Sequence, residues 1–528
     1  MDVERTLRQL ERNPDDSDAL AELFEAVWSN AEQLERFVED VHVDGVHELR
    51  NDHPKWFTRH NVRMPYPLGV FEPRDVREVK RRLVDAAEQG LTSKPLGAAY
   101  NFSDTANTKD ILLSMTEHIN DVSPVTRDTL ASHAESDLWR VDSGATVGRV
   151  NRRLWGHGRA LLNQPGFEKL TFIGAACTGG HGSGIRIGPL CESVTSLRLA
   201  TIDRTGDALE VQIEPSNGIT DPQLHRTIHP QIPLHQDDSL FRAALVCSGT
   251  MGVVTEVVIR TQASYRLEER RTLRKWRKIS GQLENLLADD SLHSVHVWVN
   301  PYDVENGNSC VLTTYHRTND EPKGERGIGI RCGHLELAHR IIQILIQNNP
   351  RSIPNMLESA LRATLPTSKK VVMDAPDALN FGGPNYFPAE AIDVGIDSSD
   401  TVSAVNDLLT LYKRLRDNDA QYVTAPIGLR FVGPSDAFLS PQFRRSTCMI
   451  EQPILRKTPG LRNTLARALD LLKDKYLGRP HWGQWNNLDH VDCARLYPEY
   501  DAFRRIRNDL DPRNVFRNSF TDRIGLTG

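Results

Sequence analysis

Three glycine-rich segments are candidates for binding a ligand that carries phosphate. They are KPLGAAYNFSD at residues 94–104, FIGAACTGGHGSG at 172–184 and SGTMGVVT at 248–255. A backbone that must approach a pyrophosphate or a flat ring closely needs residues without a Cβ, and its free N–H groups must point at the ligand. One such segment alone is explained equally well by ordinary tight turns. Three of them in one region favour a cofactor that carries phosphate.

These segments do not match the common nucleotide-binding fingerprints. The sequence has no GxxxxGK[ST] motif. It also has no GxGxxG between a predicted strand and a helix with an acidic residue about 20 positions later. Neither a P-loop nucleotidase nor a Rossmann dehydrogenase is therefore predicted.

Two helices are predicted beside these segments. Pro73 stands at a first-turn position, apolar residues recur at helical spacing from Val76, and Gly90 follows where a C-terminal cap belongs. Thr146 is a suitable N-cap for a second helix. Both helices would bury one face.

Short β-branched runs predict strands at residues 138–141, 194–202, 209–213 and 252–259. The second and third runs flank the turn residues DRTGD, which predicts a hairpin. Strands mixed with amphipathic helices indicate an α+β fold for this part of the chain.

The basic run RRTLRKWRK at residues 270–278 follows Glu268 and Glu269. We interpret it as the solvated face of a helix, with an anion-binding patch as the alternative.

The overall composition is that of a globular protein of several domains. The chain has 528 residues, of which 39% are hydrophobic and 25% charged, and 64 basic against 70 acidic residues give a net charge of −6. Binding to a nucleic-acid backbone needs a clear excess of basic charge. We therefore expect no nucleic-acid partner.

Cysteine and histidine usage gives no indication of a disulfide scaffold or a metal site. The seven cysteines contain no CxxC pair, and His229 and His235 lie six positions apart without nearby carboxylates. The N-terminus is charged, and no stretch approaches 18 uninterrupted apolar residues. We expect no metal, no membrane span and a cytoplasmic location.

Taken as a set, the motifs resemble a known flavoprotein family. The first glycine-rich segment, LWRVDSGATVGRVNRRLWGHG at 138–158 and the two later glycine-rich segments are similar to the FAD-binding domain of the vanillyl-alcohol-oxidase, or PCMH-type, flavoproteins. Three later segments resemble aldonolactone (D-arabinono-1,4-lactone) and alditol oxidases. These are IGLRFVGPSDAFLSP at 427–441, RPHWGQW at 479–485 and LYPEYDAFRRIRNDLDPRNVFRN at 496–518.

The resemblance implies an α+β architecture with four parts. A PCMH-type FAD-binding domain would occupy residues 57–265 and a substrate or cap domain residues 266–475. Residues 476–528 would return to the flavin site. Before them, residues 1–56 have helical spacing of apolar residues and predict a helical extension.

The resemblance also implies which residues lie around FAD. The predicted set is Gly97, Ala98, Ala99, Tyr100, Asn101 and Ser103 from the first segment; Gly174, Ala175, Cys177, Thr178, Gly179, His181, Gly182 and Gly184 from the second; and Gly249, Gly252 and Val254 from the third.

One departure from the family concerns how the flavin is attached. Many relatives carry a histidine at the position of Tyr100, and that histidine is their covalent anchor. Because a tyrosine has no ring nitrogen, we predict non-covalent FAD. Cys177 is the thiol in a cofactor loop and could form a thioether, but a free cysteine is more often a small buried residue.

A second departure concerns the substrate side. The resembling oxidases show Glu-x-Arg where this chain has Gly428 and Arg430, and Lys where it has Gln484. A positioned acid or base commonly contributes about 10² to 10⁴ in rate. The loss of two ionisable groups therefore indicates a changed substrate.

Five residues remain as substrate-side candidates. Arg430 would orient a substrate oxygen or stabilise negative charge on the reduced flavin. His481 would accept a hydroxyl proton, with a packing role as the alternative. Gln484, Tyr386 and Glu451 are the remaining candidates.

Together these features predict an FAD-dependent oxidoreductase that oxidises a C–OH group of a sugar-like, lactone or other alcohol substrate. Hydride would pass to the flavin, and electrons would then pass to O₂ or another acceptor. Gly180, a small residue near the flavin, favours O₂. One alternative is a tailoring oxidase of a larger, less polar metabolite, and another is a protein that keeps the fold for binding or for a non-redox step.

Overall fold

The computed structural model describes residues 67–327, 349–366, 370–381 and 389–527, together with residues 56–57, 63–64, 346–347 and 368. The predicted helical extension at residues 1–56 lies, except for Trp56, outside the described residues. Strands β1 (Trp56–Phe57) and β2 (Arg63–Met64) form a short antiparallel pair.

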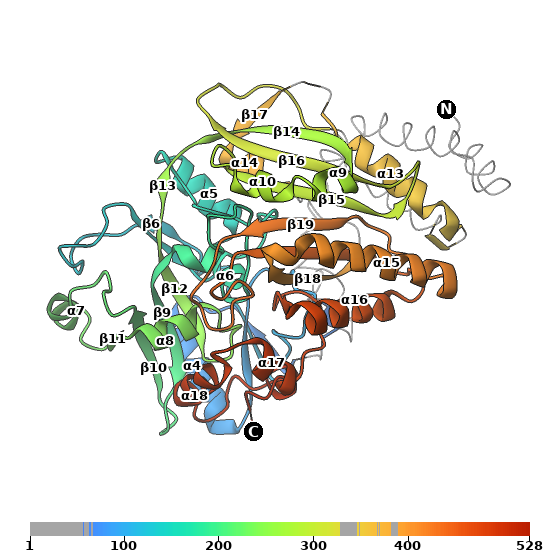
Figure 1. Cartoon of the computed structure of the whole chain (residues 1–528). Helices are drawn as coiled ribbons and strands as arrows, with labels where there is room; N and C mark the ends of the chain where they lie inside the picture. Colours follow the sequence, from blue (N-terminus) through green and yellow to red (C-terminus); the bar gives the residue numbers. More distant parts are fainter. Residues whose placement is uncertain are drawn as a thin grey trace, which may run out of the picture.

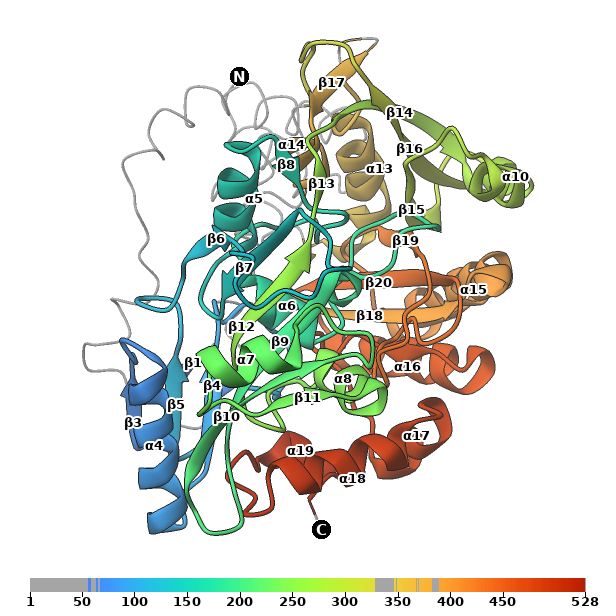
Figure 2. The same ribbon diagram turned by 90° about the vertical axis from the view of Figure 1, so that its left-hand side faces the viewer.

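A small parallel sheet holds the first glycine-rich segment. Its order is β3-β5-β4, and helix α4 packs beside it (Figure 2). The Asp75 carboxylate accepts a hydrogen bond from Glu78 N–H at the start of α4, and Gly90 ends the helix at φ +66°. The predicted helix is confirmed. The bounds are β3 (Gly69–Phe71), α4 (Val76–Gln89), β4 (Ser93–Leu96) and β5 (Ile111–Ser114).

A six-stranded sheet of order β11-β10-β9-β12-β7-β6 forms the second layer. The predicted hairpin is the antiparallel pair β9–β10, and the predicted buried strand is β12 at the centre of the sheet. Thr146 Oγ1 accepts from Arg149 N–H and caps α5, as predicted. The bounds are β6 (Val122–Pro124), β7 (Leu138–Asp142), α5 (Val147–Trp155), α6 (Phe172–Cys177), β9 (Val194–Ile202), β10 (Ala208–Glu214), α7 (Pro222–Ile228), β11 (Leu234–Gln236), α8 (Asp238–Leu245) and β12 (Val253–Arg260).

The chain crosses to a larger sheet through β13 (Gln262–Ala263), which pairs with β8 (Arg159–Ala160). This eight-stranded sheet has the order β17-β14-β16-β15-β19-β20-β18-β21, and α15 and α16 pack against it and each other (Figure 1). The bounds are β14 (Arg266–Lys275), α9 (Trp276–Ser280), α10 (Leu283–Ala288), β15 (Ser294–Asp303), β16 (Asn308–Thr318), α13 (Ile353–Ala363), β17 (Val371–Asp374), α14 (Ala375–Leu379), β18 (Ala389–Asp397), α15 (Thr401–Asp419), β19 (Ile427–Val432), β20 (Thr447–Leu455), α16 (Leu461–Tyr476) and β21 (Arg479–Pro480).

The basic run at residues 270–278 corrects one expectation. Most of it belongs to strand β14 and not to the surface of a helix. Alternation along the strand buries Glu269 and Arg271 on one face, where their side chains pair at 2.7 Å, and exposes Arg270. Buried Arg326 also contacts Glu269, at 2.8 Å. The charges in this run therefore serve a buried ion-pair network in addition to solvation.

The C-terminal segment returns to the first glycine-rich loop. Helices α17 (His490–Leu496), α18 (Tyr500–Leu510) and α19 (Ser519–Arg523) lie at the bottom of the view in Figure 2, and α18 packs against α8. The Asn518 side chain donates to the backbone oxygens of Asp104, Thr105 and Asn107. Arg523 forms a 2.8 Å ion pair with Asp104. The chain end thereby fixes the loop that follows β4.

Within the described residues, we find no helix with both the length and the apolar character needed to cross a membrane.

Candidate active site

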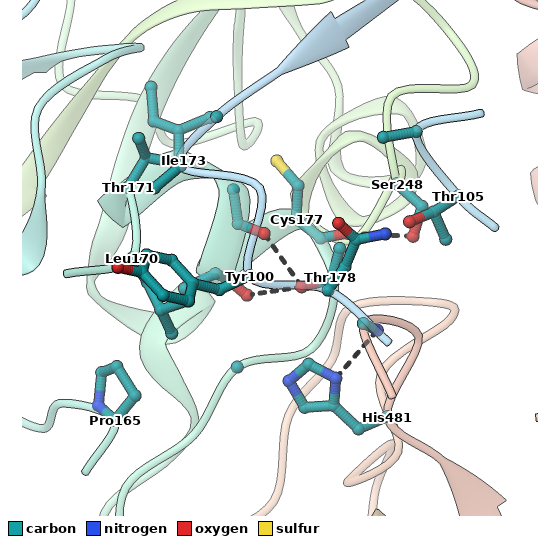
Figure 3. A pocket seen from close by; sticks show the side chains of 18 of the residues that line it. Tyr100, Thr105, Pro165, Leu170, Thr171, Ile173, Cys177, Thr178, Ser248 and His481 are labelled. Carbon is teal, nitrogen blue, oxygen red and sulfur yellow. Dashed lines mark hydrogen bonds between the residues drawn. The ribbon is translucent and has the colours of Figure 1, made fainter. Parts of the chain in front are cut away.

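A large cavity separates the glycine-rich loops from the eight-stranded sheet. Its volume is about 320 Å³, within the range of about 300 to 1,000 Å³ that is common for pockets that bind a drug-sized ligand. One wall comes from the loop after β4, from α6 and from the loop before β12 (Figure 3). The other wall comes from β18, β19, β20 and the loop after β21. The cavity therefore lies between segments that are far apart in the sequence.

Two loops on the cofactor side pack around one threonine. A Cβ built at Gly97 would lie 2.3 Å from Thr171 Oγ1, and a Cβ at Gly174 would lie 2.5 Å from the same oxygen. Real Cβ atoms do not approach oxygen so closely, because the van der Waals overlap is too large. The glycines therefore let the loop after β4 approach the start of α6 closely while leaving the cavity floor open.

Two of these loops hold residues in the left-handed backbone region. Ala99 has φ +58°, Ser248 has φ +48° and Gly249 has φ +62°. A non-glycine residue there costs about 1 kcal/mol or more, and such residues concentrate at ligand sites. The left-handed residues therefore mark these two loops as part of a ligand site.

Lys94 is a buried cation in the wall of the cavity. Its Nζ donates to the Gly249 carbonyl at 2.9 Å. Burial, together with the positive charge of Arg507, lowers the pKa of Lys94 to about 7, against the opposing attraction of Asp511. A bound anion would stabilise the charged form of this buried ammonium group.

Most of the predicted cofactor residues line this cavity. Those in its wall are Gly97, Ala98, Ala99, Tyr100, Asn101, Gly174, Ala175, Cys177, Thr178, His181, Gly249, Gly252 and Val254. The other four, Ser103, Gly179, Gly182 and Gly184, lie behind the wall. A Cβ at Gly182 would lie 1.8 Å from Asn163 Oδ1. Packing against Asn163 therefore explains why this residue is a glycine.

These observations fit FAD. The glycine cradle, the left-handed turns and the buried lysine could hold its pyrophosphate, and the wall around Tyr100, Leu170 and Ile173 offers apolar contact to a flat ring (Figure 3). Tyr100 packs edge to face on Phe167, with 4.8 Å between the ring centroids.

The opposite wall is built from side chains on three neighbouring strands. Along β18, β19 and β20, alternate residues enter the hydrophobic core against α15 and α16. The residues between them face the cavity, and among these are Asp393, Arg430 and Glu451. Because side chains alternate between the two faces of a strand, these three charged groups lie together on the face that lines the cavity.

These three groups form one charged cluster with His181. Arg430 Nη2 lies 3.0 Å from Glu451 Oε2 and 3.6 Å from Asp393 Oδ2, and His181 Nε2 lies 2.8 Å from Asp393 Oδ2. Burial alone would raise the pKa of Asp393, but the charge and hydrogen bond of His181 and the charge of Arg430 hold it at about 2. Burial raises the pKa of Glu451, and Arg430 opposes this only in part.

His481 has its two ring nitrogens in different roles. Nδ1 accepts a hydrogen bond from Gly483 N–H at 2.9 Å (Figure 3). Burial lowers the pKa of His481 to about 4, despite the opposing charge of Asp393. The imidazole is therefore neutral at pH 7 and carries its proton on Nε2. In this state Nε2 of His481 is a hydrogen-bond donor, and a role of His481 in accepting a hydroxyl proton stays a prediction.

Comparison with known proteins decides the family. A D-arabinono-1,4-lactone oxidase family model matches residues 257–524, just over half of the chain, and an FAD binding domain model matches residues 67–212. The chain belongs to the D-arabinono-1,4-lactone oxidase family. It is an FAD-dependent oxidoreductase of the class that acts on CH–OH groups.

Individual relatives cover nearly the whole chain. An L-gulono-1,4-lactone dehydrogenase of Mycobacterium tuberculosis is 25% identical over 89% of this chain and 99% of its own length. An L-gulonolactone oxidase of Mus musculus is 25% identical over 87% of this chain and 95% of its own length. The cholesterol oxidase structure from B. sterolicum is 15% identical, with a TM-score of 0.71 over 89% of this chain and 96% of that one. The last likeness shows the fold alone, which is the α+β, PCMH-type fold predicted from the sequence.

Within this member of the D-arabinono-1,4-lactone oxidase family, the structure brings four of the five substrate-side candidates into one cavity. Arg430, His481, Gln484 and Glu451 all line it. Tyr386 lies outside the described residues.

Sequence reasoning missed several residues of the cavity wall. Asp393 is the most important, because it contacts both His181 and Arg430. Its only signal is that it is an acidic residue between the apolar residues Ile392 and Val394 of β18. Lys94 was read only as part of a glycine-rich segment, and Thr171 and Phe381 carried no signal.

Gly180 does not support the argument for oxygen access. It lines the cavity, but a Cβ built there would lie 2.6 Å from the Ala175 backbone oxygen. The end of α6 therefore explains its small size, so that Gly180 gives no information on the electron acceptor of this family member.

Proposed function

We propose that this protein oxidises a C–OH group of a polyhydroxylated small molecule, an aldonolactone or an alditol, with non-covalently bound FAD. The observation that carries the proposal is the composition of the cavity, which joins a glycine-built cradle to a wall bearing Arg430, Glu451, Asp393 and neutral His481. A wall so rich in donors and acceptors suits a ligand rich in hydroxyl groups.

When bound, FAD would accept the substrate hydride, and the hydroxyl proton would leave to a base or to water. The protein supplies position and electrostatics. His481 donates its Nε2–H to a substrate oxygen, and Arg430 orients a second oxygen through its guanidinium group. Because the pKa of His481 is held at about 4, this donor stays neutral throughout the physiological pH range.

The non-covalent attachment rests on Tyr100, which lines the cofactor wall and has no nucleophilic ring nitrogen. Protein precipitated with acid should be colourless, and the flavin should remain in the supernatant. Yellow colour in a washed pellet would contradict this part of the proposal, and Cys177 would then be the first candidate for the linkage.

The proposed acceptor is O₂, as in the relatives named oxidases, and a dehydrogenase among them makes another acceptor the alternative. Peroxide formed in air during turnover supports O₂, while its absence favours a dye or a protein acceptor. A cytoplasmic location is proposed as well, since the six described cysteines form no disulfide with one another.

The test of the proposed function is anaerobic reduction of the FAD-loaded protein. L-Gulono-1,4-lactone, D-arabinono-1,4-lactone and xylitol are added separately, and the flavin absorbance near 450 nm is followed, a band that belongs to the cofactor. Bleaching by one of the three supports the proposal. Bleaching only by a long-chain alcohol favours a larger, less polar substrate, for which the aromatic wall of Phe167 and Phe381 would be the contact surface. A protein that cannot be loaded with FAD contradicts the proposal and favours a non-redox role.

A further inference from the structure

Glu451 lies in the middle of a row of paired residues that crosses the eight-stranded sheet. It stands directly opposite Gly428 of β19 on one side and Asp393 of β18 on the other. Directly paired residues point to the same face of a sheet. Arg430 is two residues beyond Gly428 on β19 and therefore shares this face, which is the face that lines the cavity.

Gly428 is not required as a glycine by its backbone or by the space around it. Its φ is not in the left-handed region. A Cβ built there would lie 3.5 Å from Glu451 Cβ and 3.7 Å from Glu451 Oε2, which is ordinary van der Waals contact. By contrast, a Cβ at Gly97 or Gly180 would overlap a neighbouring atom. The surroundings of Gly428 therefore leave room for a Cβ, and the Glu451 carboxylate lies beside that position.

The two carboxylates of the cluster differ in their availability to a ligand. The Asp393 side chain is 1% exposed, and its carboxylate is engaged by His181. The Glu451 side chain is 32% exposed, in the cavity wall, and its described polar partner is Arg430. Glu451 is therefore the carboxylate that a second ligand in the cavity can reach.

We propose that the Glu451 carboxylate accepts hydrogen bonds from substrate hydroxyl groups. Together with Arg430 it forms an acceptor–donor pair that binds two neighbouring hydroxyls. A glutamate at position 428 would place a carboxylate in the same role. The proposal rests on the proposed function and extends it to the specificity of the site. The 3.0 Å between the guanidinium and the carboxylate matches the spacing at which adjacent hydroxyl oxygens hydrogen-bond to one another. A polyol or hydroxylactone with vicinal hydroxyls is thus the class selected.

The exchange of position is the critical test. In Glu451→Ala the carboxylate is removed, and in the double variant Gly428→Glu/Glu451→Ala it is returned from the neighbouring strand. Because the two Cβ positions lie 3.5 Å apart on one face, the new carboxylate reaches Arg430 with the same length of side chain. The control Gly428→Gln/Glu451→Ala has the same size without the charge, and Glu451→Gln tests the charge at its native position.

Each FAD-loaded variant is measured in two ways, with xylitol and L-gulono-1,4-lactone as probes. The first is the Kd of the corresponding deoxy compound, which lacks the C–OH group that is oxidised and therefore does not reduce the flavin. This Kd is obtained from the change in the flavin spectrum as the compound is added under anaerobic conditions. The second is the KM and kcat for the probe that the wild type oxidises.

We expect Glu451→Gln and Glu451→Ala to raise KM and Kd by about 10- to 100-fold, since hydrogen bonds to a charged group contribute to that extent. The double variant with glutamate at position 428 should recover at least about tenfold of this loss, and the glutamine control should not recover. Bound FAD should be unchanged in all of them.

Two results overturn the inference. One is that Glu451→Gln stays within threefold of the wild type. The other is that glutamate and glutamine at position 428 behave alike. Both leave the proposed function intact, because the wild type still oxidises the probe. If the wild type oxidises neither probe nor D-arabinono-1,4-lactone, the proposed function fails, and the Kd series alone then decides whether the pair binds vicinal hydroxyls.

Discussion

The two walls of the cavity are built in different ways. The wall proposed to hold the cofactor includes glycines such as Gly97 and Gly174, which cannot carry a Cβ because Thr171 occupies the space. The wall proposed to contact the substrate presents side chains, with Arg430 and Glu451 projecting from adjacent strands. The shape of the first wall depends on glycines that have no Cβ. The chemistry of the second wall depends on which side chains the neighbouring strands carry. The first wall therefore tolerates little change, whereas the second can exchange one residue for another.

Glycine substitution gives the largest expected difference between the walls. In Gly180→Ala the new Cβ would lie 2.6 Å from the Ala175 backbone oxygen, and backbone cannot move aside as a flexible side chain can. We expect FAD affinity to fall by about 100-fold or more, since the loop must shift. The measurement is FAD bound per protein after dialysis, with circular dichroism to verify the fold.

The matched control for that experiment is Gly428→Ala, whose Cβ meets nothing closer than 3.5 Å. FAD content should be unchanged, and turnover should stay within about threefold of the wild type. Similar loss of FAD in both variants would remove the distinction between the two walls.

The role of His481 as a neutral donor gives the next largest effect. His481→Ala removes the donor and should slow flavin reduction by about 10- to 100-fold, whereas His481→Gln, which keeps an N–H donor, should recover part of the rate. Because the pKa of His481 is about 4, the wild-type rate should show no inflection from this group between pH 5 and pH 8. An inflection near pH 6.5 that disappears in His481→Gln would show that the imidazole is a base.

Lys94 is expected to make FAD affinity depend on pH by about tenfold. As the pH rises, FAD affinity should fall while the stability of the FAD-free protein increases. Its pKa of about 7 in the folded protein lies below the 10.5 of an exposed lysine. The unfolded chain therefore binds more protons between pH 7 and pH 10, so that this group makes the FAD-free protein more stable as the pH rises through that window. FAD affinity should change in the other direction and weaken by about tenfold from pH 6 to pH 8, because the anionic pyrophosphate prefers the charged lysine.

Lys94→Met separates the two contributions. It should raise the thermal midpoint of the FAD-free protein and make FAD affinity weaker and independent of pH. Fluorescence titration with FAD at pH 6 and pH 8, and thermal unfolding without FAD, provide both measurements. An unchanged pH dependence in Lys94→Met would exclude this lysine as its source.

The contrast between the walls also explains what the sequence could reveal. Glycine clusters are local, so that the segments at 94–104 and 172–184 identified the cofactor side directly, and helix caps such as Thr146 and Gly90 were equally local. The pairing of Glu451 with Gly428 and Asp393 depends on the register of three strands that are far apart in the chain. No local pattern encodes such a register.

The same reason limits other interpretations of the sequence. The missing carboxylate at position 428 predicted a changed substrate, which stays a prediction, but the sequence did not reveal that Glu451 places a carboxylate beside Arg430 from the next strand. The charges of β14 read as a solvated helix because their partner Arg326 lies 57 residues away from Glu269. In both cases a charge was interpreted without its partner across the sheet.

The attachment of the chain end to the first glycine-rich loop has a consequence for how the protein is made. Asn518 holds the backbone of Asp104 across 414 residues of sequence. At roughly 5 to 20 residues per second, a ribosome needs roughly 20 to 80 s to synthesise that interval. The loop after β4 therefore leaves the ribosome long before Asn518 is synthesised, and the contacts that fix this loop form only after that interval.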